Sequence, residues 1–346
     1  TSFSLATSVP LFTGFPIPNT IKLNQLNLEA APQALEKAKN DIRMQVAQAY
    51  VQILYDMEIA DVAVRQVDID SMQVVRLQRF FDNGKASGAE VSQQKATLAQ
   101  SRLTATQAHN NLQLSLLALS QLLELPSPEG FMVVRPSAQR LQAIPDSPNE
   151  IFQEALLYKP EVKAEQLRLD ATEKSIKIAQ ASLYPTLSLN GGLQTNYYKT
   201  SGMEQESFGT QLKNNFSQYI GLNLSIPIFN RFSTRNNIRS ARIDRENQQL
   251  LLDRVKKSLY KEIQQVYYNA VAAKAKYESC EVAQQSGADA FRLAQAKYDN
   301  GKATITEFNE AKNRYLKAES DLVQARYEDL YQTSLLDFYQ GRELDF

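Results

Sequence analysis

The sequence of 346 residues has little of what metal centres, disulfide frameworks and most catalytic sites require. It holds one cysteine, Cys280, and one histidine, His109. These counts exclude a disulfide framework, a Cys/His zinc site and any triad that needs a second imidazole. No phosphate-binding loop or cluster of paired acids is present either. The sequence therefore predicts no cofactor and no enzyme activity.

Tryptophan is also absent, and glycine and proline number only 12 each. That composition suits long helices. Lys plus Arg and Asp plus Glu are both 38, so the formal net charge is zero. A balanced charge argues against nucleic acid as a partner bound through bulk electrostatics. No run of 18 or more apolar residues occurs, so we expect no membrane-spanning helix.

The strongest positive signal is an internal repeat. The sequence Asp-Asn-Gly-Lys-Ala at 82–86 recurs at 299–303, an offset of 217 positions (299 minus 82). The same offset, without any gap, aligns further identical residues. They are Pro10 with Pro227, Phe12 with Phe229, Phe15 with Phe232, Asn19 with Asn236, Ile21 with Ile238, Tyr50 with Tyr267, Glu90 with Glu307, and Lys95 with Lys312. An unbroken register predicts a two-fold internal repeat whose elements have equal lengths.

The repeat predicts three regions along the chain. These are a partial first copy at 1–124, a connector at 125–148 and a second copy at 149–346. Subtracting the offset from 149–216 places its counterpart before residue 1. We therefore expect the chain to be truncated at its N-terminus, lacking about 70 residues and any signal peptide.

Apolar and polar residues alternate in three stretches, 1–12, 186–197 and 219–228. Period two predicts strands with one apolar and one polar face. Each stretch is about ten residues long, the length of a tilted strand that crosses a bilayer. A half-buried strand in a soluble sheet is the alternative. Residues 199–216, polar with two glycines, are predicted to form an exposed loop between two strands.

Two segments, about 20–80 and 232–285, contain no glycine and predict very long helices. A 60-residue helix would be about 90 Å long and would pack lengthwise against a neighbour. After each Asp-Asn-Gly turn, where glycine supplies positive φ, a long return helix follows. A further helix pair is expected at 149–182. The proline-rich connector is predicted to hold a short strand at Phe131–Val134. The fold class is thus mainly α with a small β part.

Several short motifs together resemble the TolC-like outer-membrane efflux proteins of Gram-negative bacteria, over essentially the whole chain. The strand-end motif is Ser-Val-Pro-Leu-Phe at 8–12 and Ser-Ile-Pro-Ile-Phe at 225–229. Leu-Leu-Tyr-Lys-Pro-Glu at 156–161 is similar to the family's helix break. Ala-Gln-Ala-Ser-Leu-Tyr-Pro at 179–185 is similar to its entry from helix to strand. The two Asp-Asn-Gly-Lys-Ala turns are similar to its helix tips.

The resemblance implies a homotrimeric channel in the outer membrane. Its transmembrane β-barrel strands would face lipid, and its long antiparallel helical hairpins would form a hollow α-barrel across the periplasm. It would be a passive conduit in a tripartite efflux or type I secretion system. A periplasmic adaptor protein and an inner-membrane transporter would be its partners, and the transporter would choose the cargo. A periplasmic or cytosolic coiled-coil scaffold without channel activity is the alternative.

The resemblance also implies a gate after the second tip turn. The family's two constriction acids correspond to Glu307 and Glu310, which are spaced i to i+3 on one helix face. In the first copy Glu90 matches Glu307, but Gln93 replaces the second acid. Tyr298 matches a family tyrosine that helps to close the tip. Acids on a solvated helix face, favoured by the helix dipole near its N-terminus, are the alternative reading.

The tip turns are the expected adaptor contacts, although a plain helix hairpin would need the same residues. The turn residues are Asp82, Asn83, Gly84, Lys85, Asp299, Asn300, Gly301 and Lys302. The arginine that partners the family tyrosine is Ala303 here, and Lys302 is the nearest cation in sequence. Lys95 and Lys312 are expected to be packing or solvated positions.

Overall fold

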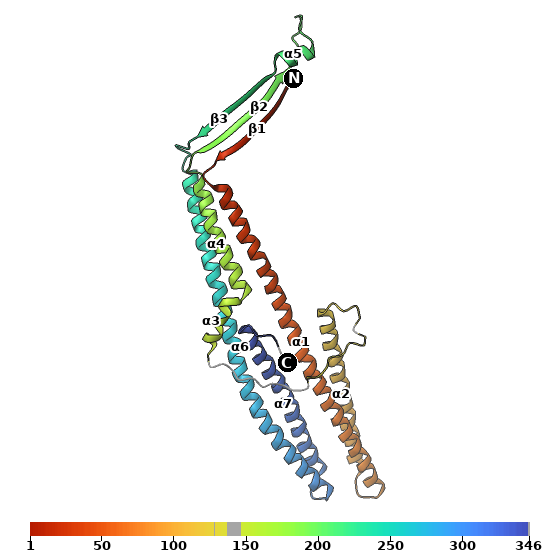
Figure 1. The fold of residues 1–346 in the computed structure, drawn as a ribbon. Coiled ribbons are helices and arrows are strands. Elements are labelled where there is room, and N and C mark those ends of the chain that lie inside the picture. Colours follow the sequence, from red (N-terminus) through yellow and green to blue (C-terminus); the bar gives the residue numbers. More distant parts are fainter. Residues whose placement is uncertain (128, 137–146, 345–346) are drawn as a thin grey trace. The chain divides into compact units, whose positions relative to one another are not determined.

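The computed structural model describes residues 1–127, 129–136 and 147–344. The chain is mainly helical, with one small sheet, as predicted (Figure 1). In chain order the elements are β1 (Ser2–Phe12), α1 (Pro16–Asp82), α2 (Gly88–Leu122), α3 (Pro148–Tyr158), α4 (Pro160–Ala181), β2 (Thr186–Asn196), α5 (Phe208–Asn214), β3 (Ser217–Ser225), α6 (Ser233–Asp299) and α7 (Ile305–Tyr339).

The chain divides into two compact units. One unit combines Thr1–Glu36 with Lys159–Lys256 and contains the sheet, and the other combines Lys37–Tyr158 with Lys257–Phe346. The helices α1 and α6 contribute residues to both units.

The sheet has the strand order β1-β2-β3, and both pairs are antiparallel. The three predicted strands are confirmed, although β3 ends at Ser225, before Pro227. Pro10 lies near the end of β1, which continues to Phe12 as predicted, with a shift of register between these two residues. A proline is tolerated there because β1 forms an edge of this sheet, where one backbone N–H has no ladder partner.

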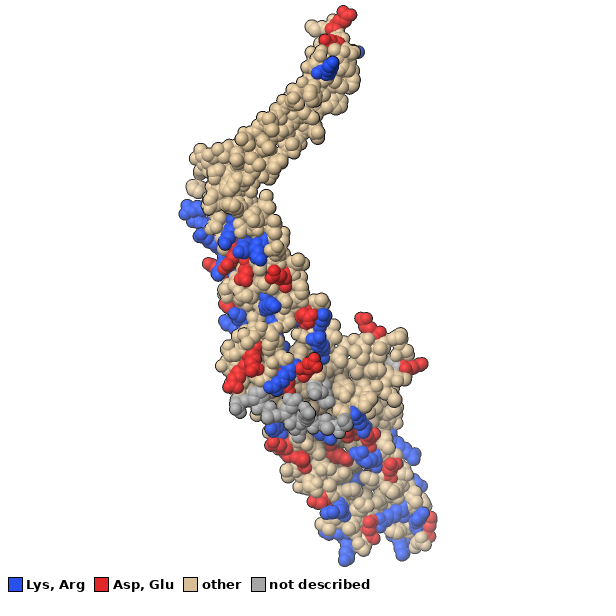
Figure 2. All heavy atoms as spheres, viewed as in Figure 1, with Lys and Arg blue, Asp and Glu red and all other residues tan. Residues whose placement is uncertain are grey.

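The two faces of the sheet differ as the alternation predicted. Leu5 lies opposite Leu193, and Leu189 lies opposite Leu222, on the apolar face. This face is bare within the chain, since Leu5 is 71% exposed and Ile220 is 80% exposed. None of the three strands contains a charged residue. In Figure 2 charged side chains gather on the helices and at α5 but not over the strands.

The segment between β2 and β3 contains a short helix that the prediction of a loop over 199–216 missed. Ser207 caps α5 by accepting a hydrogen bond from the Thr210 N–H. Gln211 is buried and accepts a hydrogen bond from the Tyr198 N–H at 3.1 Å. The ring of Phe208 lies 5.1 Å from that of Tyr197. These contacts attach the helix to the end of β2.

The long helices are confirmed and extend beyond the predicted ranges. Both α1 and α6 have 67 residues, and both α2 and α7 have 35 residues. Pro32 lies inside α1 at an exposed position. The helix pair expected at 149–182 is present as α3 and α4, with Pro160 at the first position of α4.

The predicted short strand at Phe131–Val134 is wrong, because these residues form no strand. Instead, the segment that contains them lies against α1. The Tyr50 hydroxyl donates to the Val134 carbonyl at 3.2 Å, and Val133 packs against the apolar cluster between α1 and α7. Contacts with helix side chains thus replace pairing with another strand. The cluster consists of Val51, Leu54, Val323, Tyr327 and Leu330.

Replacing Gly14 with alanine is expected to destabilise the unit that contains the sheet by about 2–4 kcal/mol. Gly14 joins β1 to α1 with φ +77°, and a Cβ there would lie 2.6 Å from the Ala181 carbonyl oxygen. The matched control is Gly84→Ala. Gly84 has a similar φ of +71° with no atom within 4 Å, so only about 1–2 kcal/mol of backbone strain is expected. Equal shifts of the urea unfolding midpoint would contradict the predicted clash.

A candidate gate at the hairpin turns

The two hairpin turns have the same backbone structure. In the first, the Lys85 N–H donates to the Phe80 carbonyl at 2.7 Å. In the second, the Lys302 N–H donates to the Lys297 carbonyl at 2.8 Å. Gly84 and Gly301 have φ of +71° and +68°. The prediction that these glycines supply positive φ is confirmed.

Each return helix begins with a capping box. In α7, Thr304 Oγ1 accepts from the Glu307 N–H at 3.2 Å, and the Glu307 carboxylate accepts from the Thr304 N–H at 2.7 Å. In α2, Ser87 and Glu90 make the same pair of bonds at 3.2 Å and 2.7 Å. Glu307 and Glu90, both predicted at the gate, therefore also hold the first turn of their helices.

These bonds affect the ionisation of both acids. Hydrogen bonds from the Thr304 backbone and side chain lower the pKa of Glu307 below its ordinary value. Bonds from Ser87 likewise lower the pKa of Glu90. Glu310 lies one turn further along α7, where its side chain is 62% exposed and 3.9 Å from the Arg314 guanidinium. Glu307 is therefore ionised at neutral pH and stays ionised to a lower pH than an ordinary glutamate.

Tyr298 lies in a cluster that joins the two hairpins. The Arg76 guanidinium, from α1, lies 4.9 Å from the centre of the Tyr298 ring and pairs with the Asp299 carboxylate. We call Arg76, Tyr298 and Asp299 the tip cluster. Burial raises the pKa of the Tyr298 hydroxyl, and Arg76 opposes that shift. Tyr298 also packs against the buried ring of Phe308 at 5.1 Å.

A second cluster, in which four of five residues are buried, lies along α1 before the tip. Asp70 pairs with the Lys312 ammonium and also accepts hydrogen bonds from the Gln94 amide at 3.2 Å and from the Ser101 hydroxyl. Asn309 donates to the Gln94 carbonyl oxygen at 3.4 Å. We call these five residues the buried cluster. They come from three helices, α1, α2 and α7.

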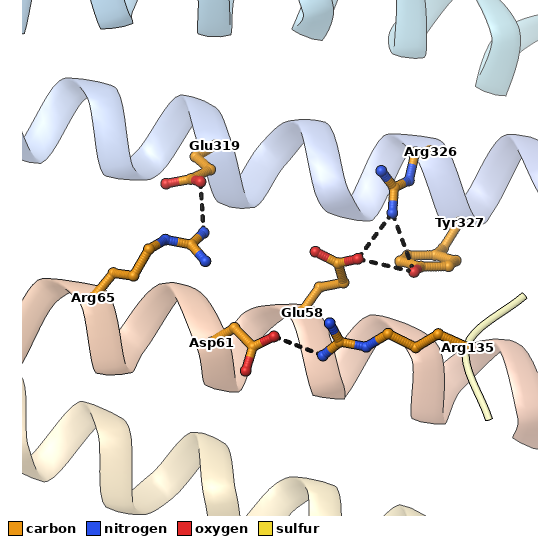
Figure 3. Close-up of polar contacts among 7 residues, drawn as sticks. All are labelled: Glu58, Asp61, Arg65, Arg135, Glu319, Arg326 and Tyr327. Atoms are coloured by element: carbon orange, nitrogen blue, oxygen red, sulfur yellow. Dashed lines mark hydrogen bonds and ion pairs between the residues drawn. The ribbon is translucent and has the colours of Figure 1, made fainter. Parts of the chain in front are cut away.

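A row of more exposed polar contacts continues between α1 and α7 (Figure 3). Arg65 pairs with Glu319 at 2.6 Å, and Glu58 pairs with Arg326 at 3.0 Å. On the connector side of α1, Arg135 pairs with Asp61 at 2.6 Å. The two hairpins are thus linked by side chains at several levels.

The structure brings some of the predicted site residues together and adds others. Tyr298 lies within the tip cluster, whereas Glu307 and Glu310 begin α7 and Glu90 begins α2. The partner of Tyr298 is Arg76, which sequence reasoning missed, rather than Lys302. No local spacing could have shown it, because Arg76 lies on the other hairpin. The buried pairing of Lys312 with Asp70 was also missed.

Among the described residues, no helix combines the length and the apolar character needed to cross a membrane. In the same part of the chain, no group of three or more His, Cys, Asp or Glu side chains could hold a metal ion.

The outer membrane protein VceC of Vibrio cholerae has a similar structure, with a TM-score of 0.80 and 18% sequence identity, over 99% of this chain and 80% of that one. The sequence model of the outer membrane efflux protein family matches residues 1–124 and 151–340. The chain belongs to that family, so the resemblance inferred from the motifs is confirmed.

Two curated relatives show how much of a family member the chain represents. It is 26% identical over 309 residues to protein CyaE of Bordetella pertussis, covering 88% of this chain but 62% of CyaE. It is 23% identical over 315 residues to the cobalt-zinc-cadmium resistance protein CzcC of Cupriavidus metallidurans, covering 90% of this chain and 70% of CzcC. The chain thus spans less than two thirds of the length of CyaE.

Proposed function

We propose that the protein is the outer-membrane channel of a tripartite efflux or type I secretion system, a passive conduit from the periplasm to the exterior. Family membership supports this function. The observation that carries it is the sheet, because its strands contain no charged residue and their apolar face is exposed. A bare apolar face of that kind suits contact with lipid.

The sheet also supports assembly into a homotrimer. In the sheet of the described residues, β1 and β3 are both edge strands. An exposed edge pairs readily with another strand, and a closed barrel leaves no edge unpaired in the membrane. Copies of the chain arranged around one axis would contribute their sheets to one closed transmembrane β-barrel, with the polar face towards the lumen.

The long hairpins would form the α-barrel, and the two hairpins of each chain would belong to the two copies of an internal repeat. The equal lengths of α1 and α6, and of α2 and α7, support the repeat. On this proposal 1–124 and 149–346 are the two copies, and 125–148 connects them. The Asp82–Lys85 and Asp299–Lys302 turns would contact a periplasmic adaptor protein, which would join the channel to an inner-membrane transporter.

The gate would lie at the tips of the hairpins. Glu307 and Glu310 of each copy would place carboxylates around the axis, with Glu90 nearby and Tyr298 holding the hairpins together. Rings of carboxylates favour the passage of cations. The lowered pKa of Glu307 supports a charge that persists at neutral pH.

Replacing Glu307 and Glu310 together with glutamine is expected to reduce cation over anion selectivity several-fold in planar bilayers. Glutamine can still accept the capping bond at position 307, so the charge is removed while the start of α7 is kept. In the unsubstituted channel, the contribution of Glu307 to selectivity should be lost at a lower pH than that of an ordinary glutamate, because its pKa is lowered.

The matched control is Glu278→Gln with Glu281→Gln, two exposed acids of α6 with the same spacing. This pair is expected to change selectivity little. Equal effects of the two double substitutions would remove Glu307 and Glu310 from the gate. Failure of the unsubstituted protein to conduct ions at all would refute the proposed channel.

A further inference from the structure

Among the polar links between the two hairpins described above, the buried cluster alone is centred on a fully buried ion pair. Asp70 and Lys312 are both 0% exposed, and Gln94 and Ser101 are 1% and 2% exposed. Both carboxylate oxygens of Asp70 accept hydrogen bonds, one from Lys312 and Gln94 and the other from Ser101. At the start of any separation each charge would lose its partner while still buried among protein atoms, which opposes parting of the helices at this level.

The tip cluster is held much more weakly. The Arg76 and Asp299 side chains are 27% and 44% exposed, so water can replace each partner at little cost. Arg76 lies six residues after Asp70 on α1, about 9 Å along the helix axis. A weak link near the turns is thus followed, a short distance along the helices, by a strong one.

The buried cluster occurs once and is not a product of the repeat. Lys95 occupies the position of Lys312 in the first hairpin, but it is exposed and donates to Gln78 within that hairpin. Gly287 occupies the position of Asp70 and packs against Tyr315, whose Cα would lie 3.5 Å from an added Cβ. The charged pair therefore joins one hairpin to the other at a single level.

Beyond the buried cluster, away from the turns, the row of ion pairs keeps α1 and α7 together. Arg65 with Glu319 and Glu58 with Arg326 are its members. The ion pair between the hairpins is thus fully buried at the level of Asp70 and Lys312, and the ion pairs on either side of that level are partly exposed.

We propose that Asp70 and Lys312 are positioning residues that fix the point from which the two hairpins can part. Opening of the gate is then confined to the final turns, between the buried cluster and the tips. This inference rests on the proposed channel function. It predicts that breaking the tip cluster moves the turns and leaves the helices beyond the buried cluster in place.

Distances between pairs of spin labels, measured by double electron–electron resonance on the protein purified in detergent, test this. One pair, at Lys85 and Lys302, reports on the turns. The other, at Val64 and Lys317, reports on α1 and α7 beyond the buried cluster. All four positions are exposed. Cys280→Ser removes the native thiol in every sample.

In the Arg76→Ala variant, the distance between the turns is expected to lengthen by about 5 Å or more, the scale of a one-turn displacement. The second distance is expected to stay unchanged. When Asp70→Asn and Lys312→Met are added, which removes both charges together, the second distance should lengthen too. Lys95→Met, the matched control, should leave it unchanged.

Three results would overturn the inference. First, the distance between Val64 and Lys317 could lengthen with Arg76→Ala alone. Second, that distance could stay unchanged after both charges are removed, and third, the turns could fail to part with Arg76→Ala. The first and third need no substitution in the buried cluster, so the test stands even if the triple variant fails to fold. Absence of ion conduction in bilayers would refute the channel and leave these distances informative.

Discussion

Replacing Lys312 with methionine is expected to lower the free energy of unfolding by about 3–5 kcal/mol. Methionine fills a similar volume, but Asp70 stays buried with its charge uncompensated, because Gln94 and Ser101 supply only neutral donors. The measurement is the shift of the urea unfolding midpoint in detergent, with the slope of the transition compared to confirm the same unfolding reaction.

The control is Lys95→Met, at the corresponding exposed position of the other hairpin. Its effect is expected to stay within about 0.5 kcal/mol, as for an ordinary surface substitution. Adding Asp70→Asn to Lys312→Met should recover much of the lost stability, because no charge then remains buried. Equal losses for the two single lysine substitutions would contradict the account of the buried cluster.

Replacing Arg76 with alanine is expected to shift the ratio of open to closed channels by about 5- to 150-fold towards the open state. Each copy loses a partly exposed ion pair with Asp299 and a cation–π contact with Tyr298, together about 1 kcal/mol. In a trimer that opens in one step, three such losses add up. The measurement is the open probability in planar-bilayer recordings.

Arg292→Ala is the matched control. Arg292 is 83% exposed and pairs with Asp289 one turn away on the same helix, so its loss affects no contact between hairpins. The open probability of the Arg292→Ala channel is expected to equal that of the unsubstituted protein. Arg76→Lys, which keeps the charge but loses the planar stacking group, should give an intermediate shift. An unchanged open probability with Arg76→Ala would mean that the tip cluster does not hold the gate closed.

The elements that sequence reasoning predicted well depend on local or periodic signals. The strands follow from strict alternation, the long helices from the lack of glycine, and the turns from Asp-Asn-Gly, whose glycines have the expected positive φ. Short exceptions were missed. The helix α5 depends on the Ser207 cap and buried Gln211, and Phe131–Val134 is held by contacts with a distant helix rather than by strand pairing.

The candidate site was predicted only in part, because several of its contacts join residues that are far apart in the sequence. Glu307 and Glu310 could be aligned with family positions, but the capping role of Glu307 needs the Thr304 geometry to be seen. Arg76 and Asp70 lie more than 200 residues before their partners Tyr298 and Lys312. Such pairs depend on how two long helices are aligned side by side, which periodicity alone leaves open.

The most direct test of the central claim is an electron cryo-microscopy map of the protein purified from outer membranes. Three copies around one axis are expected, with the strands of all three copies in one closed barrel and an open lumen lined by the long hairpins. Single copies whose apolar sheet face is covered by their own helices would contradict it.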